Sequence, residues 1–194
     1  MGTRETLIEA GLEALISRGY EGMGIGPLLA SVTVPKGSFY HFFDSKEAFV
    51  GTVLDAYAER YLRLRRERFT DVTRTPLSRL MSYFETLVQE MDTAHPVYGC
   101  LYGVLAQSRP SLGPDLAGKL RSKFDAWESD LANLIVEAQR SGEVDPSLDP
   151  IDAARHLIDL YEGMVLRARA TNVAPSFHGF RAFAARALGA QALL

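Results

Sequence analysis

Residues 34–46 constrain the fold more than any other segment, because they contain one complete short helix and the start of the next. Pro35 suits the first position of a helix, where its missing N–H has no helical partner and its φ is already helical. Phe39 recurs with Phe42 or Phe43 at spacings of three and four, which is the spacing of a buried helical face. We therefore expect a short helix that begins near Pro35 and buries Phe39 with one of the other two rings.

The remaining positions of this helix face outward and carry groups that can bind nucleic acid. They are Lys36, Gly37, Ser38, Tyr40 and His41. Lysine and histidine can neutralise phosphates, serine and tyrosine hydroxyls can bond to phosphates or base edges, and a glycine lets two backbones approach closely. This mixture favours a helix that contacts DNA.

Apolar residues recur at helical spacing along nearly the whole chain, and no alternating pattern of useful length predicts a strand. The sequence therefore predicts an all-α protein with about nine helices. Gly19 ends the first helix, and Gly24 caps a short second one that runs to Ser31. Asp44 and Glu47 are expected to form a capping pair that opens a long helix. That helix and the later ones are expected to end near Arg68, Thr93, Ser108, Ser141, Arg169 and Leu188, with Asp149 capping the eighth and a break at His95-Pro96.

Length and composition bound the class of protein. With 194 residues and 47% apolar side chains, the chain can bury one substantial core or a small domain packed on a larger one. No apolar run approaches the roughly 18 to 20 residues that span a bilayer, and the N-terminus lacks a signal sequence, so we expect a cytoplasmic protein without membrane contact. The single cysteine, Cys100, cannot form an internal disulfide.

Charge gives little general attraction to DNA. The whole chain has a net charge of −3, and residues 1–50 hold four basic against six acidic side chains. Non-specific affinity for DNA comes mainly from lysine and arginine. Any DNA binding is therefore expected to depend on where the few cations lie and to be modest and salt-sensitive.

The first helix, the turn at Gly19-Tyr20, the short second helix and residues 34–46 together resemble the DNA-binding domain of the TetR family of repressors. The resemblance implies a helix-turn-helix domain in residues 1–50 and a helical ligand-binding and dimerisation domain in residues 51–194. It also implies a repressor that binds a palindromic operator in double-stranded DNA as a dimer and is released by a small-molecule effector.

Arg4, ahead of the helix-turn-helix, joins the outward residues as an expected DNA contact through this resemblance. Lys46 lies in the first turn of the next helix, where a cation opposes the helix dipole, so we expect it to bind a phosphate; ordinary solvation is the alternative. Thr33 stands where the family generally has a glycine in the turn. Because a β-branched residue tolerates a left-handed backbone poorly, we expect strain at Thr33.

The middle and later helices combine aromatic bulk with a few polar groups, a mixture that suits a small-molecule pocket. The candidate ligand-binding residues are Tyr61, Phe84, Met91, Tyr98, Cys100, Tyr102, Trp127, Tyr161, Glu162 and Arg169. For any single one of them, membership of an ordinary core is about as good an interpretation. A carboxylate ligand would need an arginine such as Arg169 or paired tyrosine hydroxyls.

Residues 98–105, the helix around Trp127 and residues 162–169 resemble the acrylate-responsive and electrophile-responsive repressors of the same family. In electrophile-sensing relatives the cysteine that corresponds to Cys100 can be a reactive thiol, which requires a partly exposed thiolate. A cysteine in an apolar helix is more often a small buried hydrophobe. Both interpretations of Cys100 stay open, and the second is preferred.

The last two helices carry more apolar surface than one monomer is expected to cover, notably Leu157, Leu160, Met164 and Val165. The small residues of the final helix permit close helix approach. Two protomers could therefore form a four-helix bundle with two-fold symmetry, and packing within one chain is the alternative.

Enzyme chemistry finds no support in the sequence, which has no phosphate-binding loop, no metal-spaced set of histidines and cysteines and no serine in a strained turn. We expect no catalytic site, no metal and no cofactor. The alternative function is a dimeric helical interaction or small-molecule-binding protein with weak or no specific DNA binding. Salt-dependent binding to an operator would separate it from a repressor.

Overall fold

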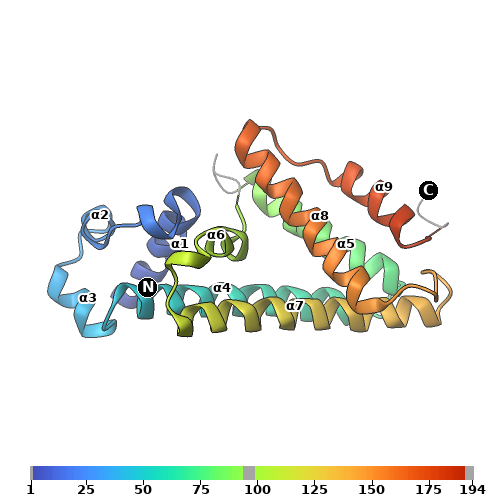
Figure 1. Cartoon of the computed structure of the whole chain (residues 1–194), viewed down its shortest axis with the longest axis horizontal. Helices are drawn as coiled ribbons and strands as arrows, with labels where there is room; N and C mark the ends of the chain where they lie inside the picture. Colours follow the sequence, from blue (N-terminus) through green and yellow to red (C-terminus); the bar gives the residue numbers. More distant parts are fainter. Residues whose placement is uncertain (1, 94–98, 191–194) are drawn as a thin grey trace. The chain divides into compact units, whose positions relative to one another are not determined.

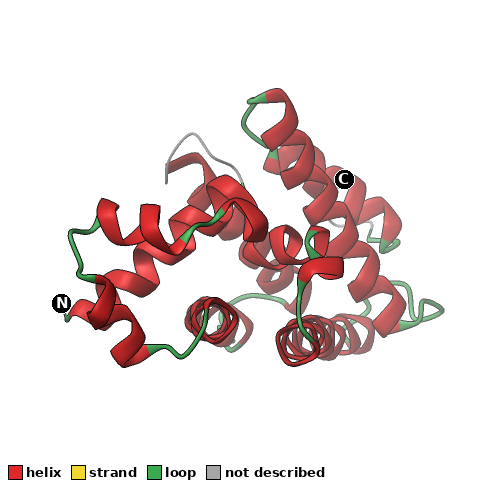
Figure 2. Ribbon diagram, turned by 60° about the vertical axis from the view of Figure 1, so that its left-hand side comes forward, coloured by secondary structure: helices red, strands yellow, loops and turns green. Residues whose placement is uncertain are grey.

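The computed structural model describes residues 2–93 and 99–190, which form nine α-helices, one short 3₁₀-helix and no strand (Figure 1). The helices are α1 (Thr3–Gly22), α2 (Ile25–Ser31), α3 (Lys36–Phe42), α4 (Lys46–Phe69), α5 (Pro76–Thr93), α6 (Leu101–Gln107), η1 (Arg109–Ser111), α7 (Pro114–Arg140), α8 (Pro150–Thr171) and α9 (Phe177–Ala187). Figure 2 shows helices joined by loops only, which confirms the all-α prediction. The expected break at His95-Pro96 lies outside the described residues. Within the described ranges, no helix combines the length and the hydropathy needed to cross a membrane.

Two compact units make up the chain: unit 1 contains residues 1–61 and 99–124, and unit 2 contains residues 62–98 and 125–194. Helices α4 and α7 each begin in unit 1 and end in unit 2, so both are continuous across the boundary. The predicted boundary at residue 50 separates a DNA-binding domain from a ligand-binding and dimerisation domain. The division into compact units does not test this functional boundary, which remains a prediction.

Aromatic rings from α3 and α4 form the core of the N-terminal part of unit 1. The ring centroids of Phe39, Phe43 and Phe49 lie between 4.9 and 5.3 Å apart, and all three rings are buried. The sequence left open whether Phe42 or Phe43 is buried together with Phe39. The structure buries Phe43, whereas Phe42 is 39% exposed. On α1, a Cβ at Gly11 would overlap the Phe49 ring. This ring cluster therefore holds α3 against α4 and α4 close against α1.

Helix α1 changes direction at Gly19, whose φ of 74° lies in the left-handed region. Glycine has no Cβ to oppose this conformation. The predicted end of the first regular helix is confirmed, and residues 20–22 form one further turn in a new direction. Gly24 caps α2, which ends at Ser31 as predicted.

Ser45, rather than Asp44, caps α4. The Ser45 Oγ accepts a hydrogen bond from the Ala48 N–H at 3.0 Å. The predicted capping pair of Asp44 and Glu47 is therefore wrong, because serine and aspartate are almost equally good caps and the chain geometry selects the serine. Glu47 instead accepts a bond from the Leu116 N–H, at 3.4 Å, in the first turn of α7.

In unit 2, α5, α8 and α9 pack around Phe84. Its ring centroid lies 6.0 Å from that of Tyr161 on α8 and 4.7 Å from that of Phe180 on α9. The predicted cap of α8 is confirmed, since the Asp149 side chain accepts a bond from the Asp152 N–H at 2.9 Å. These contacts join helices that are far apart in the sequence.

Two arginines with little exposure connect α4 and α5 to α7 within unit 2. Arg65 bonds to the Asp130 carboxylate at 2.8 Å. Arg79 bonds to Glu137 at 2.7 Å and also to the Phe69 carbonyl at the end of α4. Removal of either carboxylate would be costly, because it would leave the charge of a buried arginine without its partner.

We expect Ser45→Ala to lower the free energy of unfolding by about 1 kcal/mol, because one N–H of the first turn of α4 loses its acceptor. Urea unfolding followed by circular dichroism measures the loss. Asp44→Ala is the matched control and is expected to change the free energy by less than about 0.5 kcal/mol. Equal losses in both variants would contradict the assignment of the cap.

Candidate functional site

Helix α3 presents the outward face that the sequence predicts. Pro35 is its N-cap, with an extended ψ of 143°, so the helix begins at Lys36, one residue later than expected. Of the five outward residues, Lys36, Gly37, Tyr40 and His41 are exposed and Ser38 is half-buried. The Tyr40 ring is 50% exposed although its edge meets the buried Phe39 ring. Lysine, histidine and two hydroxyls thus share the solvent side of one short helix.

The turn between α2 and α3 contains the expected strained residue. Thr33 has a φ of 55°, in the left-handed region. The Thr33 N–H donates to the Ala30 carbonyl at 3.4 Å, and the Val34 N–H donates to the Leu29 carbonyl at 3.1 Å. These bonds close the turn and hold the threonine in a conformation that a β-branched residue rarely adopts. The turn therefore has a left-handed backbone of the kind that favours glycine, and a threonine occupies that position.

Arg4 and Lys46 each lie beside an aromatic ring. The Arg4 Cζ is 5.8 Å from the centre of the Phe43 ring, and the Lys46 Nζ is 4.6 Å from the centre of the Tyr20 ring. Cation–π contacts hold a charge in place without neutralising it. Burial lowers the pKa of Lys46, and the carboxylate of Glu21 acts in the opposite direction.

Three candidate ligand-binding residues of unit 1 gather around Tyr57, which the sequence analysis did not select. The Tyr57 hydroxyl lies 3.5 Å from the Cys100 Sγ and donates to it. The Tyr57 ring lies 4.5 Å from the Tyr61 ring and 5.5 Å from the Tyr102 ring. Cys100 is 5% exposed and is the N-cap of α6. The spacing of four between Tyr57 and Tyr61 was a signal that could have found this residue.

The other described candidates belong to unit 2. Trp127 and Tyr161 are buried with their ring centroids 5.9 Å apart, and the Phe84 ring centroid lies 6.0 Å from that of Tyr161. Met91, Glu162 and Arg169 are half-buried, and Tyr98 lies outside the described residues. The aromatic candidates among the described residues therefore form one cluster in each unit.

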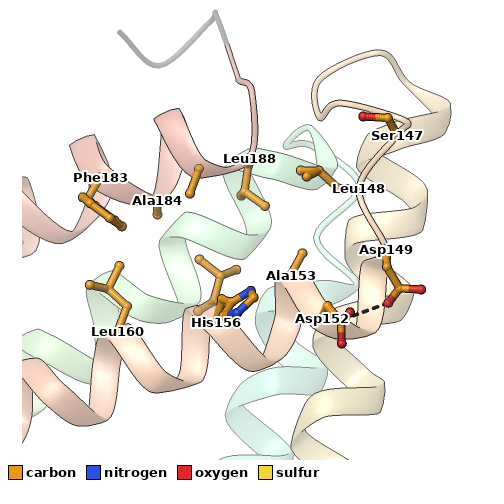
Figure 3. Close-up of a pocket in the computed structure, with 12 residues that line it drawn as sticks. Ser147, Leu148, Asp149, Asp152, Ala153, His156, Leu160, Phe183, Ala184 and Leu188 are labelled. Carbon is orange, nitrogen blue, oxygen red and sulfur yellow. Dashed lines mark hydrogen bonds between the residues drawn. The ribbon is translucent and has the colours of Figure 1, made fainter.

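A cavity of about 270 Å³ opens between α8 and α9 in unit 2 (Figure 3). We call it the α8–α9 groove; its lining includes His156, Leu157, Leu160, Phe183, Ala184 and Ala187. Figure 3 shows Phe183 and Leu160 at one end of the groove and Asp149 and Asp152 at the other. None of the predicted ligand-binding residues lines it.

The apolar surface of α8 differs from the expectation. Leu157, Met164 and Val165 are buried within the chain, and Leu157 also lines the α8–α9 groove. The large apolar side chains that stay exposed on α8 and α9 are instead Ile151, 37% exposed, Leu166, 52% exposed, and Phe183, 61% exposed.

Two family models match the sequence. The model for bacterial regulatory proteins of the tetR family matches residues 7–53. The model for the tetracyclin repressor-like, C-terminal domain matches residues 76–184. The chain belongs to the TetR family.

Relatives of this TetR-family chain are transcriptional regulators. The transcriptional regulator AcuR of Cereibacter sphaeroides is 35% identical over 91% of the chain and 80% of the relative. The HTH-type transcriptional repressor DhaR of Mycobacterium sp. strain GP1 is 32% identical over 86% of the chain and 82% of the relative. The chain is thus a DNA-binding transcriptional regulator of the TetR family. These relatives are not enzymes, and the described residues contain no group of His, Cys, Asp and Glu side chains that could hold a metal ion.

A solved structure shares this TetR-family fold over nearly its whole length. The regulatory protein TetR from Rhodobacter sphaeroides superimposes with a TM-score of 0.89 at 34% sequence identity. The match covers 94% of this chain and 96% of the other. The fold of the described residues is therefore that of a TetR-family regulator.

Proposed function

We propose that this regulator is a cytoplasmic repressor that binds a palindromic operator in double-stranded DNA as a homodimer and leaves it when a small molecule binds. Residues 1–50 would bind DNA, and residues 51–194 would bind the effector and the second protomer. The observation that carries the proposal is the exposed face of α3, where Lys36, Tyr40 and His41 lie together with Ser38 and Gly37.

Each residue of this face has a distinct part in the proposed contact. Lys36 and His41 neutralise phosphates, while the hydroxyls of Ser38 and Tyr40 bond to phosphates or base edges. A Cβ at Gly37 would meet no other atom, so this position leaves room for a close approach of the DNA backbone. Lys46 holds a phosphate at the start of α4, where a cation without such a partner would oppose the helix dipole.

Dimerisation follows from the size of the recognition element. One helix of seven residues contacts too few base pairs to specify an operator. Two such helices about 34 Å apart contact successive turns of the major groove and require a two-fold symmetric site. The proposed dimer therefore explains why the operator would be palindromic.

The surface of α8 and α9 supports the proposed dimer. Phe183 projects at the edge of the α8–α9 groove, which offers an apolar seat for the same residue of a second copy. Helix α9 carries Arg181 and Arg186 and no acidic residue, whereas Asp159 is exposed on α8, where Asp152 is ion-paired with Arg155. A two-fold axis that sets α9 of one protomer against α8 of the other brings these opposite charges together.

The effector is proposed to be a small carboxylate such as acrylate, bound reversibly. Paired tyrosine hydroxyls or an arginine suit a carboxylate. The candidates for this role are Tyr102 in unit 1, Tyr161 and Arg169 in unit 2, and Tyr98, which lies outside the described residues. The burial of Cys100 beside Tyr57 favours its role as a packed side chain over that of a reactive thiol. Release is a population shift: the effector binds better to a conformer in which α4 moves the two recognition helices away from one-turn spacing.

The net charge of residues 1–50 favours a second candidate, a dimeric helical or small-molecule-binding protein without specific DNA binding. Phosphate contacts make true operator binding steeply salt-dependent, with a slope that grows with the number of contacts. Binding to DNA at two salt concentrations therefore decides between the two candidates.

Fluorescence anisotropy with DNA from the upstream region of the protein's own gene tests the DNA contact. We expect binding of modest affinity that weakens at higher salt, and no retention by the double variant Lys36→Ala/Tyr40→Phe, which loses a phosphate contact and a hydroxyl. The oligomeric state and melting temperature of the variant should match the parent. Unchanged binding would remove α3 from the interface, and loss of folding would make the two residues structural.

Phe183→Ala tests the proposed dimer surface. A side chain that anchors an interface typically contributes about 2 kcal/mol or more, so the dimer dissociation constant should rise by about 30-fold or more. Sedimentation equilibrium measures the shift from twice 21.4 kDa towards that mass. Val72→Ala, which alters an 89% exposed residue outside the helices, is the control. A dimer of unchanged affinity would exclude Phe183 as an anchor.

Acrylate added to the DNA complex tests the effector. We expect it to release the DNA from the parent protein and from Cys100→Ser equally, because reversible binding needs no thiol. Anisotropy measured against acrylate concentration gives both midpoints. Loss of the response in Cys100→Ser alone would establish covalent sensing instead, and no release from either protein would exclude acrylate as the effector.

A further inference from the structure

Two non-glycine residues have a positive φ within residues 2–93 and 99–190, and they differ in how well their side chains tolerate it. Asn172, with a φ of 52°, directly follows α8, where a helix commonly ends in the left-handed conformation. Asparagine enters this region readily, whereas a β-branched residue is an outlier there. Thr33 is such an outlier, with a φ of 55°. A strained residue on a proposed binding surface points to a role for its side chain.

The Thr33 side chain faces solvent with a free hydroxyl. Thr33 is exposed, while the valines on either side of it, Val32 and Val34, are half-buried. The Thr33 hydroxyl makes no hydrogen bond to any other described residue. By contrast, the hydroxyls of Thr6 and Thr70 each donate to the carbonyl four residues earlier, at 3.2 and 2.8 Å. The Thr33 hydroxyl is therefore available as a donor on the outer surface of the turn.

The turn has little else to offer to an acceptor. The N–H groups of Thr33 and Val34 already donate to carbonyls of α2, and Pro35 has no N–H. The Ser31 hydroxyl is used as well, since it donates to the Leu28 carbonyl at 2.7 Å. The side chains between Ser31 and α3 are those of valine, threonine and proline. The threonine hydroxyl is thus the hydrogen-bond donor of this segment.

The position of the turn places this donor next to the proposed DNA surface. In a helix-turn-helix the N-terminal residues of the recognition helix meet the base edges, so the turn before them lies close to the DNA backbone. The Lys36 Nζ lies 6.0 Å from the centre of the Tyr40 ring, which is one helical turn further along α3. The end of the surface nearest the turn is therefore left to Thr33.

We infer that Thr33 is a further DNA-contact residue, whose hydroxyl donates a hydrogen bond to a phosphate beside the groove that α3 enters. Threonine hydroxyls are among the groups that bind DNA phosphates in this way. A glycine here would relieve the backbone and leave the phosphate without this donor. Thr33 thus lowers the stability of the turn and raises the affinity for DNA. The inference rests on the proposed function.

Three variants separate the hydroxyl from the backbone. Thr33→Val keeps the shape and removes the hydroxyl, Thr33→Gly removes the hydroxyl and the strain, and Thr33→Ser keeps the hydroxyl without the β-branch. In anisotropy titrations with the upstream DNA fragment, we expect Thr33→Val and Thr33→Gly each to raise the dissociation constant about tenfold, because a bond to a charged acceptor is lost. Thr33→Ser should stay within about twofold of the parent protein.

Salt dependence distinguishes this contact from that of a cation. Threonine carries no charge, so the slope of log affinity against log salt should be the same in all three variants as in the parent protein. Lys36→Ala, which removes a charge from the same surface, should make the slope shallower. An equally shallow slope in Thr33→Val would mean that the substitution had displaced Lys36, and it would contradict a direct contact.

Stability should change in the opposite direction from affinity. Thr33→Gly is expected to raise the melting temperature by about 2–4 °C, because it relieves the left-handed strain. Its loss of affinity then cannot come from unfolding. Asn172→Gly is the matched control, since it places a glycine at the other positive-φ position, in unit 2, and should leave DNA affinity unchanged.

The outcomes separate this inference from the proposed function. DNA binding by Thr33→Val and Thr33→Gly with the affinity of the parent protein would overturn the contact and leave the repressor proposal standing. Equal losses in Thr33→Ser and Thr33→Gly would also overturn it, because the hydroxyl would not be the cause. A lower melting temperature of Thr33→Gly would make the threonine structural. Absence of DNA binding by the parent protein would overturn the proposed function and the inference together.

Discussion

The packing of Phe39 into the ring cluster of unit 1 is the constraint on which the DNA-facing surface depends. Helix α3 has seven residues, whereas isolated helices shorter than about 12 to 15 residues are marginal in water. Burial of a phenylalanine contributes about 1.5–3 kcal/mol, and favourable ring pairs add about 0.5–1.5 kcal/mol each. Contacts with Phe43 and Phe49 therefore hold α3 in place. With Phe39 inside, helical geometry turns Lys36 and Tyr40 towards solvent.

In the same region, contacts within the protein fix the few charged side chains around Lys46. Residues 1–50 have more acidic than basic side chains. Two of the acids near Lys46 accept hydrogen bonds from within the protein: Glu21 from the Ser108 hydroxyl and Glu47 from the Leu116 N–H. Lys46 itself stays over the Tyr20 ring. Both carboxylates keep their negative charge, and the hydrogen bonds fix the direction of their oxygens towards Ser108 and Leu116.

Local signals in the sequence predicted most element boundaries. Gly19 and Asp149 act within a few residues of their own positions, through a left-handed backbone and a capped N–H, so no distant contact is needed to interpret them. The strain at Thr33 followed from comparison with the family's turn and is borne out by its φ. Asp44 failed because Ser45 is an equally good cap, and only the path of the chain distinguishes neighbours of equal propensity.

By itself, the sequence determined the all-α class, the helix order and the outward composition of α3. Helical periodicity and capping depend only on residues that are close together in the sequence. Tertiary structure decided everything that depends on which helix faces which. It buried Phe43 rather than Phe42, covered Leu157 and left Phe183 exposed. It also set Tyr57 against Cys100, 43 positions away. Such pairs depend on the rotation and register of whole helices, which only the packing of the complete core fixes.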